Sequence, residues 1–205
     1  MKIESIKNVN ITILFSRPIN HLLISQKDLL DLFKISDPDK DKHTFIEAPG
    51  LKVFVLPAQQ KEIVFEATRI LINDKTGVDP KDSKVIDDLQ KLLNTNLFEK
   101  DKIAAYGFNY DVVAIPPNGS FKIEDLIGQK ITTSLGEIKK AGVNTSFEKN
   151  GVKYLLVLNI LEEGGKKFSA HLNSHFDISI LPDFETLKEK ISKEYREFED
   201  IIKKL

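Results

Sequence analysis

Cysteine and tryptophan are absent from the 205-residue sequence, and methionine occurs once. A chain without cysteine forms no disulfide and offers no thiolate metal ligand or thiol nucleophile. Long apolar runs are also missing, because none approaches the ~20 residues that a membrane-spanning helix needs. Residues 1–5 lead into no apolar signal-peptide segment. These absences predict a cytoplasmic protein with no membrane partner.

An excess of either charge is missing too. The sequence has 30 basic and 31 acidic side chains, which give a formal net charge of −1. Proteins that bind nucleic acid obtain much of their affinity from clustered lysine and arginine. Each Lys-Lys pair in this sequence has acidic residues nearby, which argues against nucleic acid as a partner.

Motifs for common nucleotide sites and hydrolases are absent as well. The sequence contains no Walker loop, no G-x-G-x-x-G run and no G-x-S-x-G elbow, so it predicts neither a cofactor nor a catalytic triad. Asp37, Asp39 and Asp41 have the spacing that opens an EF-hand loop. Lys42 and Ala48 stand where that loop needs glycine and glutamate, so we interpret the segment as a charged surface loop.

The sequence does contain an internal repeat. Residues 44–56 align without gaps on residues 145–157, with Thr, Glu, Gly and Lys at matching positions. Residues 10–18 lie over residues 109–117 at nearly the same offset. A repeat of this length indicates a supersecondary unit that occurs twice.

The predicted unit is β-α-β-β-β-α, once over residues 1–98 and again over residues 99–205. Hairpin turns between the strands predict a mainly antiparallel sheet with the helices on one face, which is the α+β class. One long strand is predicted over residues 62–72, with a bulge at Arg69. The two repeats form either one compact pseudo-twofold domain or two packed lobes.

Apolar residues spaced three or four apart predict two longer helices. The first covers residues 85–93 and closes the first half, and we interpret its acidic pair Asp87-Asp88 as solvated on the outward face. The second begins at Pro182-Asp183 and continues to the end of the sequence.

Two resemblances accompany this pattern. Each half opens with a strand and a short helix and closes with a longer helix, which is similar to the duplicated fold of TATA-binding protein. That fold implies a basic saddle and phenylalanine wedges that kink DNA, and this sequence has neither. Residues 11–18, and Phe176-Asp177-Ile178 before the terminal helix, resemble an uncharacterised bacterial family that implies no known activity.

The candidate site lies on a predicted strand over residues 168–180. Alternation places His171, Asn173, His175 and Asp177 on one face, and we select His171, His175 and Asp177 as ligand-binding or metal-binding residues. Residues four apart on a strand are about 13 Å apart, so only His175 and Asp177, about 7 Å apart, can share a metal. The alternative is a polar sheet face that is solvated or lines the interface between repeats.

Three functions are compatible with this sequence. The first is a non-enzymatic protein-binding or assembly module, which could form a homodimer or add a strand at a sheet edge. The second is a small-molecule binding protein, with an apolar cavity lined by Phe168, Leu172 and Leu187. The third is a metal-dependent enzyme that uses His175 and Asp177.

Overall fold

The computed structural model describes all residues except 36–41, 117–133, 135–137, 139–140 and 162–165. Its strands are β1 (Lys2–Phe15), β2 (Thr44–Ala48), β3 (Leu51–Leu56), β4 (Lys61–Glu66), β5 (Arg69–Asp74), β6 (Ile103–Ile115), β7 (Gly142–Lys149), β8 (Val152–Ile160) and β9 (Phe168–Asp177). Its helices are α1 (Gln26–Leu32), α2 (Val85–Leu93) and α5 (Phe184–Lys204), with short 3₁₀ turns η1 (His21–Leu23), η2 (Pro57–Gln59) and η3 (Lys100–Lys102). The three aspartates of the EF-hand-like segment, Asp37, Asp39 and Asp41, lie outside the described residues.

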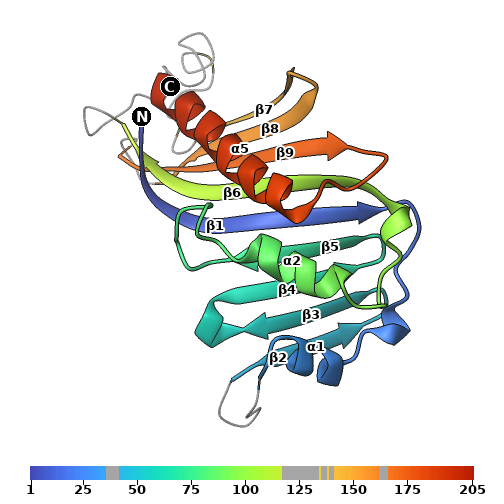
Figure 1. Cartoon of the computed structure of the whole chain (residues 1–205). Helices are drawn as coiled ribbons and strands as arrows, with labels where there is room; N and C mark the ends of the chain where they lie inside the picture. Colours follow the sequence, from blue (N-terminus) through green and yellow to red (C-terminus); the bar gives the residue numbers. More distant parts are fainter. Residues whose placement is uncertain (36–41, 117–133, 135–137, 139–140, 162–165) are drawn as a thin grey trace.

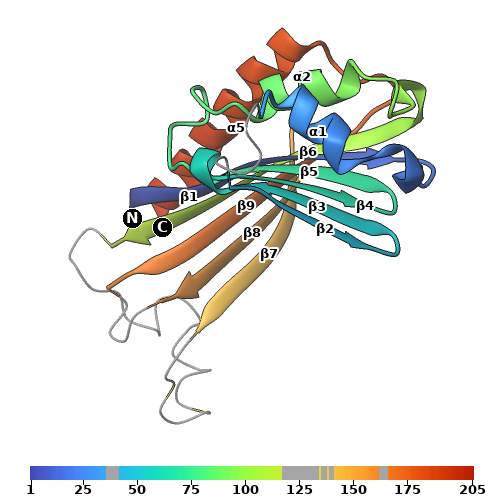
Figure 2. The same ribbon diagram turned by 90° about the horizontal axis from the view of Figure 1, so that it is seen from below.

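The strands form one nine-stranded antiparallel sheet in the order β2-β3-β4-β5-β1-β6-β9-β8-β7 (Figure 1). The first strands of the two halves, β1 and β6, pair at its centre, so the halves share one continuous sheet. The helices α1, α2 and α5 lie on one face of this sheet (Figure 2). The predicted α+β class and mainly antiparallel sheet are confirmed.

The alternation of side chains along each strand gives the sheet two different faces. On β1, Val9, Ile11 and Ile13 are buried towards the helices, whereas Asn8 and Thr12 point the opposite way. No helix of the described ranges covers that second face, which we call the open face (Figure 2). The strands β7, β8 and β9 curve away from the helix layer.

The predicted strand over residues 62–72 is wrong. The structure has two strands here, β4 and β5, which are joined by a two-residue turn at Ala67-Thr68 and pair from Glu66 opposite Arg69. The change of polar phase at Arg69 is therefore a hairpin turn and not a bulge. As a result, the first half contributes five strands, while β6 to β9 are the four described strands of the second half.

The terminal helix agrees with its prediction. Asp183 caps α5 by accepting a hydrogen bond from the backbone N–H of Thr186 at 2.8 Å. The apolar stripe of this helix, which includes Leu187, Ile191 and Phe198, is buried against the sheet. Because this stripe covers the centre of the sheet, α5 closes the helix side of β1 and β6 (Figure 1).

The acidic pair of α2 differs from the prediction of two solvated carboxylates. Asp88 has no exposed surface and forms ion pairs with Lys61 of β4 and with Lys91, the latter at 2.9 Å. Both ammonium groups also lie over the ring of Phe33, at 5.3 and 5.4 Å from its centroid. Asp87 is half-buried at the surface, where it pairs with Lys188. The pair is thus divided between the interior and the surface.

Within the described ranges, no helix is long and apolar enough to cross a membrane.

Candidate functional site: a row of amides on the open face

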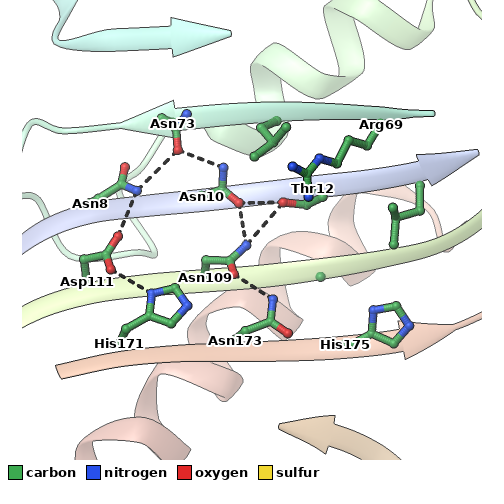
Figure 3. A pocket seen from close by; sticks show the side chains of 13 residues that line it. Asn8, Asn10, Thr12, Arg69, Asn73, Asn109, Asp111, His171, Asn173 and His175 are labelled. Carbon is green, nitrogen blue, oxygen red and sulfur yellow. Dashed lines mark hydrogen bonds and ion pairs between the residues drawn. The ribbon is translucent and has the colours of Figure 1, made fainter. Parts of the chain in front are cut away.

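Four asparagines lie side by side on four neighbouring strands of the open face. Asn73 of β5 is opposite Asn10 of β1, Asn10 is opposite Asn109 of β6, and Asn109 is opposite Asn173 of β9. Each occupies an outward-facing phase of its strand, so the pairing register brings all four carboxamides into one line across the sheet. We call these four residues the amide row (Figure 3).

The amide row is hydrogen-bonded head to tail in a single direction. Asn173 Nδ2 donates to Asn109 Oδ1 at 2.6 Å, and Asn109 Nδ2 donates to Asn10 Oδ1 at 2.6 Å. Asn10 Nδ2 then donates to Asn73 Oδ1 at 2.9 Å. Asn73 Nδ2 donates in turn to Glu62 Oε1 of β4 at 3.2 Å. The chain of bonds therefore starts at Asn173 and ends on a carboxylate.

The carboxylate of Glu62 sets this direction. An ionised carboxylate only accepts hydrogen bonds, so Asn73 must turn its NH₂ group to Glu62 and its oxygen to Asn10. Each following asparagine must then turn its NH₂ group to the oxygen of the previous one, and this orientation continues along the row to Asn173. Lys75 Nζ holds Glu62 from the other side at 2.9 Å. Aligned amides polarise one another, which strengthens the hydrogen bonds of the whole row.

A second polar group lies beside the amide row. His171 Nδ1 bonds to Asp111 Oδ1 at 2.7 Å, and Asn8 Nδ2 donates to Asp111 Oδ2 at 3.1 Å. Burial raises the pKa of Asp111, but the hydrogen bonds from His171 and Asn8 outweigh it and leave this pKa below its ordinary value. Because the Asp111 carboxylate only accepts hydrogen bonds, His171 Nδ1 is the nitrogen that donates a proton to it.

The predicted site residues divide between two groups. His175 Nε2 bonds to Asp177 Oδ1 at 2.9 Å, so these two lie together, whereas His171 pairs with Asp111 instead. Hydrogen bonds from Lys153 and from His175 lower the pKa of Asp177. In the described part of the chain, no three His, Cys, Asp or Glu residues come close enough to hold a metal ion. The pair His175–Asp177 thus has no third ligand there.

A hollow of about 330 Å³ opens over the amide row. Gly107 lies at its floor, opposite Thr12 on one side and His175 on the other, and contributes no side chain. A Cβ at Gly107 would lie 2.9 Å from the carbonyl oxygen of Ser174, so close strand approach requires glycine here. A second hollow of about 440 Å³ continues over β8 and β7, and the two share Asn173 and His175.

The sheet–helix layer, where an apolar cavity was an alternative, is filled by side chains. Phe168, Leu172 and Leu187 have no exposed surface. Phe176, which borders this layer, stacks on Tyr106 with ring centroids 4.7 Å apart. The hollow over the amide row lies on the open face instead.

Sequence reasoning identified one strand of this site and missed its partners. The phase of β9 correctly grouped His171, Asn173 and His175, but Asp111 and the other three members of the amide row were not selected. One signal was present, because the repeat alignment places Asn10 directly over Asn109. The sequence matches no protein-family model and no curated protein, so the function must be inferred from this geometry.

Proposed function

We propose that this protein is a non-enzymatic binding module that holds an extended segment of a partner protein on its open face. The observation that carries the proposal is the amide row, which starts with an open hydrogen-bonding group at Asn173. An extended chain exposes backbone N–H and C=O groups that need partners, whereas a helix satisfies most of its own. A side-chain carboxamide offers the complementary donor and acceptor.

Asn173 is the member of the row that can still bind a peptide group. Both N–H groups of Asn109 are engaged, with Asn10 and Thr12, and the oxygen of Asn10 accepts from two donors. Asn173 uses one N–H towards Asn109, and within the described ranges its second N–H and its oxygen have no partner. A backbone amide of the partner can therefore form two hydrogen bonds with Asn173. Polarisation along the row supports the acceptor strength of this oxygen.

The dimensions of the two hollows fit an extended segment. Together they cover six neighbouring strands, from β5 to β7. Five steps of about 4.8 Å between strands give a length of roughly 24 Å. That length corresponds to about seven extended residues. Asn173 and His175, which line both hollows, lie between the two ends.

The charges around the hollows support an uncharged partner segment. Arg69 pairs with Glu66, and Lys153 pairs with Asp177 at 2.6 Å. Asp111, which accepts hydrogen bonds from His171 and Asn8, and Glu148 are the carboxylates of the two linings. Both disfavour an acidic partner segment, and the binding of an uncharged segment should depend only weakly on salt. A phosphate backbone would show the opposite behaviour.

The test selects peptides from a displayed random library on the wild-type protein and measures their affinity by fluorescence anisotropy. We expect Asn173→Leu to weaken the selected peptides by about tenfold or more, because two hydrogen bonds of ~1 kcal/mol each are lost. Asn144→Leu, on the exposed strand β7 outside both hollows, is the matched control and should leave affinity unchanged. Peptides that bind Asn173→Leu as well as wild type would contradict the proposal.

A second candidate is a small polar molecule in the first hollow. Its volume of about 330 Å³ is in the lower range of known ligand pockets, and polar groups from four strands line it. A screen of polar metabolites by thermal shift distinguishes the two candidates. A compound that stabilises the wild type but not Asn173→Leu, in the absence of any selected peptide, favours this second function.

We also infer that the two halves are diverged copies of one unit, similar to the duplicated fold of TATA-binding protein. Counted outward from the centre, β1, β5, β4 and β3 have β6, β9, β8 and β7 as their counterparts. Each half closes with a helix on the same face, α2 or α5 (Figure 1). This order shifts the repeat by one strand, since the sequence alignment matches β2–β3, and not β3–β4, with β7–β8. An experimental structure whose halves do not superpose in this order would refute the inference.

A further inference from the structure

We infer that this protein forms a twofold dimer through a second surface, which lies at the ends of η1 and α1 and the segment after α2. This goes beyond the proposed binding at the open face. The surface consists of two exposed leucines, Leu22 and Leu23, and two hollows that adjoin them. We call it the leucine surface.

The leucines are held outward by a structured turn. The exposed fractions of Leu22 and Leu23 are 90% and 49%. Asn20 Oδ1 accepts a hydrogen bond from the backbone N–H of Leu22 at 3.2 Å, and Ile24 anchors the other end of the turn in the core. An apolar side chain that is fixed in water by local structure loses little entropy when a partner covers it.

Two hollows border Leu23, and each offers a place for an apolar side chain. The larger, about 590 Å³, is lined largely by apolar atoms of Leu23, Leu32 and Leu97. The smaller, about 180 Å³, lies on the other side of Leu23 and Leu97, against Pro18. The same surface therefore carries a projecting apolar residue, Leu22, and a depression able to receive it.

The two hollows differ in charge. Arg17, Lys102 and Glu99 line the smaller hollow, whereas Asp28 and Asp31 line the larger one. Within the described residues, neither Arg17 nor Asp31 forms an ion pair, and Lys102 of the smaller hollow is already paired with Asp101. Arg17 is thus a cation that is available to an acid of a partner's larger hollow, such as Asp31.

These features together identify a second copy of this chain as the partner. A twofold axis makes residue i of one copy contact residue j of the other, and residue j contact residue i. Such an axis places Leu22 of each copy in the larger hollow of the other and forms the pair Arg17–Asp31 twice. An unrelated partner would not require one patch to combine a projecting leucine, a hollow that can receive it, the cation Arg17 and the acid Asp31.

The test measures the oligomeric state of the full chain by sedimentation velocity over a wide concentration range. We expect a dimer that Leu22→Asp weakens by about tenfold or more, because an apolar side chain is replaced by a charge in a buried position. Ile180→Asp, a substitution at a residue that is 81% exposed outside this surface, is the matched control and should not affect dimerisation.

Charge exchange gives an independent test. Arg17→Glu and Asp31→Lys should each weaken the dimer, since each places like charges together twice. An equal mixture of the two variants should regain a heterodimer of near wild-type affinity, detected by capture through a tag on one variant. A wild-type protein that stays monomeric, a dimer that tolerates Leu22→Asp, or a mixture that forms no heterodimer would each overturn the inference.

Discussion

The buried ion pair between Asp88 and Lys61 provides a sharp test of how the helix layer is attached to the sheet. Asp88 of α2 has no exposed surface, and the exposed fraction of Lys61 on β4 is 8%. Replacing Asp88 with alanine leaves the Lys61 ammonium buried beside the Phe33 ring without its carboxylate. Phe33 follows α1, so the ion pair joins α2, β4 and the end of α1.

Removing one partner of a buried pair costs about 3–5 kcal/mol, because the other charge loses its compensation. For a chain of this size, each kcal/mol lowers the melting temperature by about 2–4 °C. We therefore expect Asp88→Ala to lower the melting temperature by roughly 6–20 °C. The double variant Lys61→Met/Asp88→Leu removes both charges, and we expect it to recover most of the lost stability, since apolar replacement of a buried pair is often neutral or better.

Urea denaturation followed by circular dichroism measures these free energies of unfolding. Asp87→Ala is the matched control, because Asp87 is the neighbouring acid on the same helix and its pair with Lys188 remains open to solvent, with side-chain exposures of 35% and 41%. Exposed pairs contribute about 0–1 kcal/mol, so the control should lose little stability. If Asp88→Ala loses no more than Asp87→Ala, or if the double variant is no more stable than Asp88→Ala, the reasoning is refuted.

Three further predictions concern the sheet. Gly107→Ala brings a Cβ to 2.9 Å from the Ser174 oxygen and should cost about 1–3 kcal/mol in urea denaturation. Asn109→Leu leaves its neighbours in the amide row unpaired and should cost about 1–3 kcal/mol, whereas Asn144→Leu should stay within about 0.5 kcal/mol of wild type. Burial raises the pKa of Asp74, but hydrogen bonds from hydroxyl and backbone N–H groups outweigh it, so this pKa lies below its ordinary 3.8. The stabilisation by Asp74 is complete above the pKa of this residue in the unfolded chain, and it is lost as the pH falls through its pKa in the folded protein. The stability advantage of wild type over Asp74→Asn should therefore shrink below about pH 4. An advantage that persists at lower pH would contradict this.

Features of the fold that are encoded locally could be predicted from the sequence. The Asn150-Gly151 pair predicted the hairpin between β7 and β8, and both residues have positive φ, 53° and 75°, as a type I′ turn requires. The helix α5 was likewise predicted from its apolar stripe and from Asp183. In each case, a few consecutive residues contain the whole physical reason for the structure.

The turn between β4 and β5 shows why other features escaped prediction. Ala67-Thr68 contains neither glycine, proline nor asparagine, so nothing in its composition interrupts the apolar and polar alternation around it. Its backbone groups are instead satisfied by distant parts of the chain, since the carbonyl oxygens of Ala67 and Thr68 accept from Ile19 and Phe15 at 2.8 Å. The turn is therefore stabilised by tertiary contacts.

The amide row could not be predicted for a related reason. Each of its asparagines has the outward phase of an ordinary half-buried strand, and only the register across β5, β1, β6 and β9 brings them together. The buried position of Asp88 likewise depends on Lys61 and Phe33, which are contributed by other elements. Sequence phase predicts which face a side chain occupies, but strand order decides what it meets.

The two proposed surfaces lie in different places on the molecule, so dimerisation through one leaves the other accessible. The amide row lies on the open face, whereas α1, which borders the leucine surface, lies on the helix side (Figure 2). A dimer formed through the leucine surface therefore leaves both open faces uncovered. Two linked faces bind a partner with two target segments more tightly than one face does, by a factor of up to 10²–10⁴ when the spacing matches.

Leu22→Asp separates affinity from this avidity. On a surface coated sparsely with one selected peptide, the monomeric variant should bind as the wild type does, because each contact involves a single open face. On a densely coated surface, wild type should dissociate much more slowly than Leu22→Asp. Asn173→Leu should weaken binding on both surfaces. If coating density affects wild type and Leu22→Asp equally, the dimer does not present two usable faces, even if each surface functions separately.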